Sequence, residues 1–107
     1  MIDLRHLFEN TDAHWHSTTI GRCRGGVLQA RVMIDCAAPW HCHDDWDETF
    51  VVLSGSIYLD FAEGSHRVDA GHCLAVKAGV RHRARCEGRA ELLVLGGDPA
   101  MKVSNDD

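Results

Sequence analysis

Residues 41–55 read H-C-H-D-D-W-D-E-T-F-V-V-L-S-G, and this stretch carries the strongest chemical signal in the chain. His41 and His43 stand two positions apart at an expected strand end, so both imidazoles point to the same side. Glu48 follows five residues after His43 and can add a carboxylate oxygen to the two nitrogens. Imidazole suits zinc, copper, iron and nickel, and a carboxylate extends that range toward manganese. The stretch therefore predicts part of a divalent metal site.

The same stretch opens a series of short strands. Residues 48–53 and 56–61 are β-rich runs on either side of a tight turn at Gly55, a pattern typical of a hairpin. From Val27 onward, apolar and polar residues alternate with period two, which predicts a half-buried strand. Further β-rich runs, separated by glycine-containing turns, are 66–70, 72–77, 81–86 and 90–95. Seven or so short strands with a turn every six to twelve residues favour an all-β antiparallel sandwich or barrel.

His82 is a candidate fourth ligand. It lies on the face of the run 81–86 that we expect to point inward, because successive side chains of a strand face opposite sides. The outward face carries arginines that could bind an anion or a partner subunit, although a solvated face is the simpler interpretation; they are Arg81, Arg83 and Arg85.

This spacing resembles the first motif of the cupin superfamily, in which H-x-H is followed by three or four residues, Glu, six residues and Gly. The residues in register with that motif are His41, His43, Glu48 and Gly55. The residues that match the second motif, G-x5-P-x-G-x2-H, are Gly71, Gly79 and His82. An N-terminal tryptophan, Trp15, and the phrase W-H-x-H-D-x-x-D-E extend the resemblance to small single-domain bacterial cupins of the mannose-6-phosphate-isomerase-like kind.

The resemblance implies a double-stranded β-helix, the cupin jelly-roll barrel, with a short irregular or helical N-terminal segment. It also implies a divalent metal near one barrel mouth, with iron, nickel, zinc and manganese all open. The residues that the resemblance assigns to that metal are His41, His43, Glu48 and His82. Three non-ligand positions depart from the pattern, since Asp35 replaces a Gly, Lys77 a Pro and Cys86 an Asn. These departures bear on loop geometry and on the pocket lining.

We expect a single domain in three parts. Residues 1–26 form an N-terminal segment that packs on the barrel, residues 27–97 form the barrel core and residues 98–107 form a C-terminal tail. Within the first part, residues 2–9 are expected as a short helix and residues 10–26 as irregular chain. A chain of 107 residues has no room for a separate cofactor domain.

Charge and composition exclude several partners. Sixteen acidic and eleven basic residues give a net charge of −5, so we expect no nucleic-acid or anionic-lipid partner. No run approaches the roughly 18 apolar residues that a membrane span needs, and we expect a soluble, cytoplasmic protein. The five cysteines contain no C-x-x-C pair, and free thiols are expected.

Other histidines and cysteines are expected to lie outside the site. His14 and His16 form a second H-x-H, but no carboxylate stands in strand register with them, so we expect them on the surface. No role is assigned to His66 or His72. Cys86 is expected as a small buried hydrophobic residue rather than as a thiol beside the metal.

Residues that flank the motif have open roles. Cys42 faces away from its histidine neighbours, and we expect it to be packed rather than ligating. Aromatic residues near the ligands could either plug the barrel or form an apolar wall for a substrate; they are Trp40, Trp46 and Phe50.

Two main functional classes stay open at this stage. In the first, the protein is a metal-dependent enzyme that acts on a small organic molecule. A dioxygenase requires a redox-active ion, whereas an isomerase or lyase needs only a Lewis acid. In the second, the barrel is a non-catalytic module that binds a small ligand or metal as a sensor. A purely structural role without metal is a weaker third class. In each case the resemblance implies a homodimer.

Overall fold

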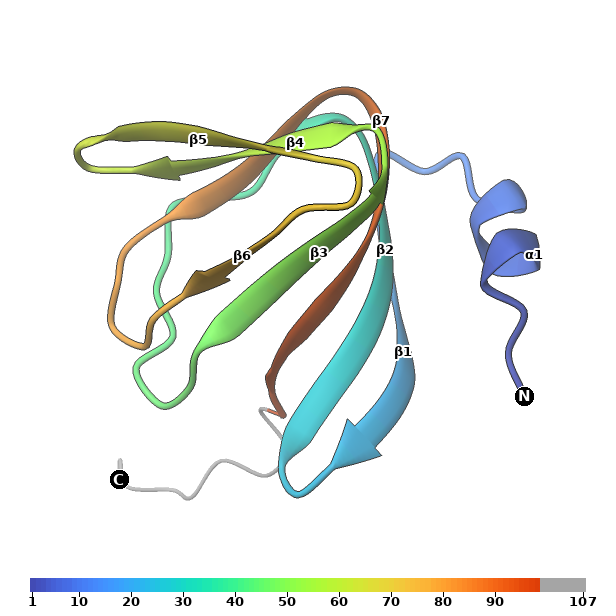
Figure 1. Cartoon of the computed structure of the whole chain (residues 1–107), viewed down its shortest axis with the longest axis horizontal. Coiled ribbons are helices and arrows are strands. Elements are labelled where there is room, and N and C mark those ends of the chain that lie inside the picture. The colour runs from blue at the N-terminus through green and yellow to red at the C-terminus, as the bar shows by residue number, and fades with distance from the viewer. Residues whose placement is uncertain (99–107) are drawn as a thin grey trace.

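Two long strands, β2 (Gly26–Ala37) and β7 (Arg83–Gly97), pair antiparallel along their length and form the centre of the sheet (Figure 1). Their Val and Ile residues favour extended backbone, since β-branched side chains pack well on a pleated surface. The structure is a computed structural model that describes residues 1–98. Its other elements are α1 (Leu4–Glu9), β1 (Trp15–Cys23), β3 (Glu48–Ser54), β4 (Ser56–Phe61), β5 (Gly64–Asp69) and β6 (Cys73–Val76).

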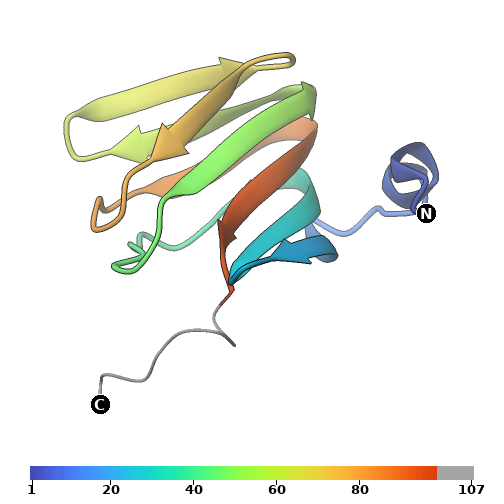
Figure 2. The same cartoon turned by 60° about the horizontal axis from the view of Figure 1, so that its bottom comes forward.

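The strands form an antiparallel sheet in the order β1-β2-β7-β3-β6 that curves over on itself, with α1 outside it (Figure 2). β7 is long enough to pair with β3 through one half and with β4 through the other, and β4 also pairs with β5. The curved sheet encloses an apolar core whose largest members are Met33, Phe50, Val52, Ile57, Leu59 and Leu92. The predicted all-β antiparallel architecture is confirmed.

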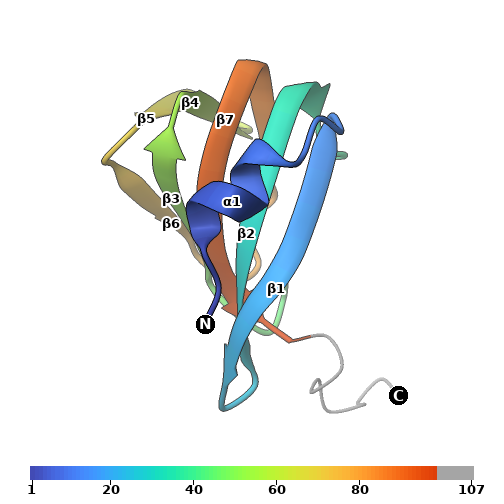
Figure 3. The same ribbon diagram turned by 90° about the vertical axis from the view of Figure 1, so that its right-hand side faces the viewer.

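β2 is buried on both faces, although the sequence predicted a half-buried strand. Its residues Ala30 and Val32 pack against Phe8 of α1, which lies across the outer side of the strand (Figure 3). Arg31 and Met33 face the barrel interior and are also buried. Alternation of hydropathy locates a strand but assigns the polar side to solvent, and here the polar side lines the interior. The strand was predicted correctly, but the prediction that its polar side faces solvent was wrong.

The helix expected at residues 2–9 is confirmed as α1. Its start is fixed by Asp3, whose carboxylate accepts hydrogen bonds from the backbone N–H groups of Arg5 at 3.0 Å and His6 at 3.3 Å. Such a cap satisfies donors that have no partner within a helix.

Residues 10–26, expected as irregular chain, contain strand β1, so that expectation is wrong. β1 pairs with β2 at the edge of the sheet, and the register shifts between Thr19 and Gly21. A bulge interrupts period-two alternation, and an edge strand is held mainly by backbone hydrogen bonds along one side. Hydropathy therefore gave no signal for this strand.

The turn expected after Cys86 is instead a bulge inside one continuous strand, β7. Gly88 has a φ of +84°, and its N–H donates to the Asp35 carboxylate at 2.7 Å. Asp35 itself has a φ of +45°, in the left-handed region, and lies where the register of β2 shifts. Asp accepts this conformation more readily than most residues because its short polar side chain bonds locally. The replacement of a motif glycine by Asp35 is thus compatible with the fold.

Residues 99–107, most of the predicted tail 98–107, lie outside the described residues. Within residues 1–98, no helix is both long and apolar enough to cross a membrane.

Candidate metal centre

The backbone holds two of the predicted ligands side by side. His41, in the loop between β2 and β3, forms an isolated antiparallel bridge with His82, which immediately precedes β7. The N–H of His41 donates to the carbonyl of His82 at 3.0 Å, and the reverse bond measures 2.8 Å. Their ring centroids are 4.6 Å apart. Residues distant in sequence are therefore brought together by two backbone hydrogen bonds rather than by side-chain contacts alone.

The same two rings are oriented through their Nδ1 atoms. His41 Nδ1 lies 2.8 Å from the carbonyl oxygen of Pro39, and His82 Nδ1 lies 2.9 Å from that of Val80. A carbonyl oxygen only accepts, so each Nδ1 carries the proton and donates it. Histidines that bind metals are commonly held in this way, which presents Nε2 to the ion.

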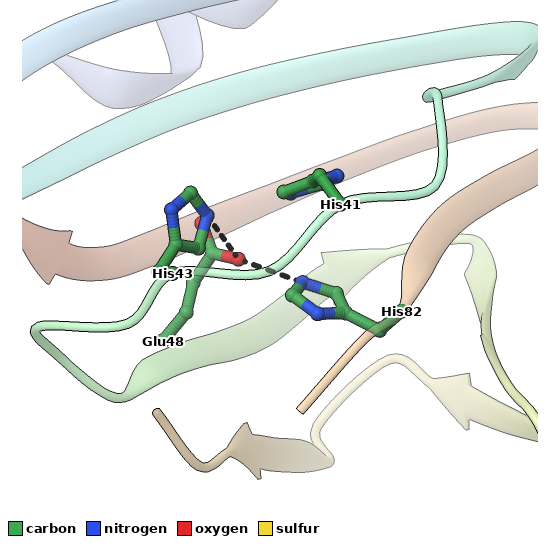
Figure 4. A group of neighbouring side chains, drawn as sticks. All are labelled: His41, His43, Glu48 and His82. Atoms are coloured by element: carbon green, nitrogen blue, oxygen red, sulfur yellow. Dashed lines mark hydrogen bonds and ion pairs between the residues drawn. The ribbon is translucent and has the colours of Figure 1, made fainter. Parts of the chain in front are cut away.

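Glu48, the first residue of β3, places its carboxylate between His43 and His82 (Figure 4). Its Oε1 atom lies 3.1 Å from His82 Nε2 and 3.5 Å from His43 Nε2. The four ligand atoms of His41, His43, Glu48 and His82 all lie within 4.8 Å of one another. Two nitrogens bound to one ion at about 2.1 Å are at most about 4.2 Å apart, so a small inward closure completes such a site.

The donor set fits a divalent cation. His43 Nε2 is buried and has no hydrogen-bond partner in the described part of the chain. An unpaired buried polar atom costs about 1–3 kcal/mol, and a bound cation removes that cost. His82 has an acceptor at each ring nitrogen, which without an ion requires a positively charged imidazolium. The site is thus arranged around positive charge, and metal binding by these four residues stays a prediction.

Burial and mutual charge set the protonation of the cluster. Burial lowers the pKa of His43 and outweighs the opposing charge of Glu48. Burial raises the pKa of Glu48, but the hydrogen bond from His82 and the charges of His43 and Arg31 together outweigh it, so the net shift is downward. The hydrogen bond to Glu48 raises the pKa of His82 against the effect of burial. A neutral His43 and an ionised Glu48 are the forms that metal ligation requires.

Asp47 ties together the two loops that carry the ligands. Its carboxylate accepts from the backbone N–H of Ala78 at 2.9 Å and from Lys77 Nζ at 3.4 Å. The N–H of Gly79 donates to the carbonyl of His43 at 2.8 Å. Lys77, which replaces the proline of the second motif, thereby adds a surface ion pair across the same junction.

Trp46 packs against the face of the His43 ring. The two rings stack at a centroid distance of 5.2 Å and an interplanar angle of 21°. The indole packs directly on Gly97, where a Cβ would lie 2.1 Å from the ring. Glycine inside a strand often marks such a close approach, so the pair Gly96-Gly97 was an available signal that sequence reasoning missed.

A cavity of about 300 Å³ adjoins the cluster and is lined by Trp15, Val27, Gln29, Arg31, Ala38, Pro39, His41, His43, Trp46, Glu48, Phe50, Ala84, Val94, Gly96 and Gly97. Three of the four predicted ligands belong to this wall, as do two of the three aromatic residues singled out from the sequence. The third, Trp40, does not line the cavity; it lies under the guanidinium groups of Arg81 and Arg83. Arg31, to which the sequence assigned no role, is part of the wall.

The remaining candidates lie outside the cluster. His14, His16, His66 and His72 are all exposed. Cys86 is buried in the core, where its thiol lies 3.5 Å from the carbonyl oxygen of Met33, as the structural interpretation predicted. Cys42 is exposed, so the expectation that it is packed is wrong; it lies in the loop between β2 and β3, and its thiol is 3.6 Å from the Asp44 carboxylate.

Known proteins share sequence and fold with this chain. Residues 30–96 match the Cupin domain family. A stretch of 47 residues is 40% identical to the uncharacterized protein YdbB of Bacillus subtilis, and it spans 43% of this chain and 42% of that protein. A cupin-2 domain containing protein from Shewanella frigidimarina superposes with a TM-score of 0.80 at 21% identity, over 88% of this chain and 91% of the other. A sugar phosphate isomerase from Silicibacter pomeroyi gives a TM-score of 0.67 at 22% identity, over 78% of this chain and 59% of the other. These structures confirm the jelly-roll barrel.

Proposed function

This chain belongs to the cupin family, and from that premise we propose that it is a metal-dependent enzyme that acts on a small organic molecule. The residues that would hold the divalent metal are His41, His43, Glu48 and His82. The proposed reaction classes are those of a dioxygenase, an isomerase or a lyase. The similar structure from Silicibacter pomeroyi is named as a sugar phosphate isomerase, which supports keeping isomerisation among them.

One observation carries the proposal: the ligand cluster faces a cavity instead of being closed off. His41, His43 and Glu48 all belong to the wall of the same cavity of about 300 Å³. Structural metal sites are typically closed by protein donors, whereas catalytic sites keep a position open. Four protein donors leave one or two positions of a five- or six-coordinate ion for a small molecule that enters this cavity.

A bound divalent ion would supply Lewis acidity, and iron would also supply reactivity toward dioxygen. The protein contributes orientation and shape. Backbone carbonyls of Pro39 and Val80 fix two imidazoles, and Trp46 holds the His43 ring from the side. Phe50 and Val94, both buried, contribute apolar side chains to the cavity wall.

Metal content of tag-free protein tests the proposal. Mass spectrometry is expected to find about one ion per chain in the wild type, and much less in His43→Ala and Glu48→Ala. His66→Ala is the matched control, because His66 is exposed and lies outside the cluster. Wild-type protein that holds no metal even after reconstitution would overturn the metalloenzyme proposal. Iron in the site would favour dioxygenase chemistry, whereas zinc, which has no redox chemistry, would favour an isomerase or lyase.

Turnover separates the enzyme from the alternative, a non-catalytic small-ligand or metal-binding module. The metal-loaded protein is incubated with a panel of small acids, sugars and phenols. Product that forms with wild type and disappears with Glu48→Ala supports the enzyme. A raised melting temperature with no product supports the binding module.

A further inference from the structure

Arg31 is a buried cation in the wall of the cavity beside the candidate metal centre. Only 8% of the residue is exposed. In the register of the sheet it stands opposite Ser17 of β1 on one side and the fully buried Leu92 of β7 on the other. Buried arginines are rare unless they are paired with an anion. Among residues 1–98, however, none of the ion pairs within 4.0 Å includes Arg31.

The contacts of the guanidinium are all with neutral groups. Its Nε donates to Ser17 Oγ at 2.7 Å, and one Nη donates to Gln29 Oε1 at 3.4 Å. The group also lies 4.3 Å from the centroid of the Trp15 ring. These hydrogen bonds use two of the five N–H groups that a guanidinium offers. The remaining three have no acceptor within the described residues, and Arg31 borders the cavity.

This arrangement leaves the positive charge without a matching anion. Burial lowers the pKa of Arg31, and the charge of Glu48 opposes that effect from beyond ion-pair distance. Arginine nevertheless stays protonated, so its burial carries a desolvation cost that an anion bound in the cavity would offset. Glu48 lies beyond 4.0 Å from the guanidinium and is hydrogen-bonded to His82, so it forms no direct ion pair with Arg31.

The guanidinium is also held in place before any ligand arrives. Ser17 and Gln29 fix its plane, and Trp15 covers one face. A fixed fork of N–H groups matches the two oxygens of a carboxylate. Among residues 1–98, Arg31 is the only lysine or arginine in the cavity wall, and a single guanidinium fork suits a single carboxylate group.

We propose that Arg31 is the anion-binding residue of this cavity and that the substrate or ligand carries a carboxylate. The carboxylate binds the guanidinium while the rest of the molecule extends toward His41, His43 and Glu48. That this carboxylate belongs to a substrate rests on the proposed function. The cavity is at the small end of the range of about 300–1,000 Å³ for ligand pockets, which favours a short acid.

The test is carboxylate binding measured by calorimetry and by melting temperature. The probes are acetate, pyruvate and benzoate at millimolar concentration, each beside its uncharged amide, with inorganic phosphate as the competing anion. Every titration is run on metal-free and on metal-loaded protein, because a carboxylate can also bind an ion directly. At least one carboxylate, and not its amide, is expected to bind metal-free wild-type protein and to raise its melting temperature.

Three variants connect the binding to the residue. Arg31→Met removes the charge and is expected to weaken carboxylate binding roughly tenfold to a hundredfold, the range of a hydrogen bond to a charged group. Arg31→Lys keeps the charge but lacks the planar guanidinium, and its carboxylate affinity is expected to lie between those of wild type and Arg31→Met. Arg67→Met is the control, since Arg67 is exposed on β5 and pairs with Asp69.

The outcomes distinguish the two proposals. Equal carboxylate binding by wild type and Arg31→Met, no binding by any probe, or a preference for phosphate overturns the assignment. Arg31-dependent carboxylate binding in a protein that never takes up metal leaves the assignment standing and refutes the proposed metalloenzyme. Metal content equal to wild type in Arg31→Met, together with lost carboxylate binding, supports both.

Discussion

Replacing Gly97 by Ala is expected to displace Trp46 and, through it, to loosen His43. A Cβ at position 97 would lie 2.1, 2.3 and 2.6 Å from three atoms of the Trp46 ring system. Ordinary carbon contacts begin near 3.5 Å, so the ring has to move by more than 1 Å or the strand has to shift. The ring cannot move so far and keep its stack on His43 at 5.2 Å. The small size of Gly97 is therefore part of the support of the metal centre.

The neighbouring glycine gives a matched control with the same chemistry. A Cβ at Gly96 would meet its nearest atom, Trp46 Nε1, at 3.4 Å, which is an ordinary contact. Gly97→Ala is expected to cost about 1–3 kcal/mol, the usual range for overpacking. Gly96→Ala is expected to be neutral or to stabilise by about 0.5–1 kcal/mol, because Ala loses less backbone entropy than Gly in a strand. Gly97→Ala should therefore be less stable than Gly96→Ala by at least about 1 kcal/mol.

Urea unfolding followed by far-UV circular dichroism measures the free energy of unfolding of both variants. Metal titration of the folded proteins measures the effect on the site, where losing the support of a ligand typically costs 10- to 100-fold in affinity. Equal stability and equal metal affinity in Gly97→Ala and Gly96→Ala would refute the reasoning. Lower stability of Gly97→Ala with unchanged metal affinity would show that Trp46 packs the strand without supporting His43.

Three further predictions concern the fold and its assembly. Hydrogen bonds from Arg85, Ser65 and Arg83 outweigh burial and hold the pKa of Asp60 well below its ordinary 3.8. This carboxylate therefore stabilises the folded state above about pH 4, and the stabilisation is lost as the pH falls below about 4. Unfolding of wild type between pH 5 and pH 2 should thus show a steeper loss of stability than Asp60→Asn. Gly55→Ala is expected to destabilise by about 1–3 kcal/mol in urea unfolding, because Gly55 has a φ of +76° and a Cβ there would lie 2.2 Å from the carbonyl oxygen of Arg89; stability like that of wild type would contradict this. We also propose a homodimer, supported by the exposed edge strand β1, and light scattering at micromolar concentration should give twice the chain mass of 11.9 kDa.

The convergence of the four candidate ligands was predictable because the chain matches two motifs of the cupin family, and because one local rule, alternation along a strand, applies to His82. His41 and His43 lie in the loop between β2 and β3 rather than at the expected strand end, although both reach the cluster. Alternation in the run 81–86 correctly turned His82 inward, where the structure leaves it 1% exposed. The contact between Trp46 and Gly97 follows no such rule. It depends on how the loop after β2 lies against the end of β7, and the sequence separation gives no hint of that.

The interior of the barrel changes character along each strand. The inward side of β2 runs from Met33 in the apolar core to Arg31 and Gln29 at the cavity. The inward side of β3 runs in the same sense from Phe50 to Glu48. Reading apolar residues as the inner face works for the closed half of the barrel and fails for the open half. The misjudged face of β2 is therefore informative, since polar residues at inward positions mark the functional end.

Burying the charge of Arg31 is not expected to stabilise the fold, so its effects on ligand binding and on stability can be measured separately. Replacing a buried charged group by an apolar side chain of similar size is often neutral or stabilising, while the loss of the Trp15 contact costs about 0.5–1 kcal/mol. Arg31→Met is therefore expected to unfold in urea within about 1 kcal/mol of wild type while it loses carboxylate binding. Unfolding measured in the presence and absence of a bound carboxylate should show ligand stabilisation of wild type alone. A variant destabilised by several kcal/mol would mean that Arg31 supports β1 through Ser17 and Trp15, and that its burial serves the fold rather than a ligand.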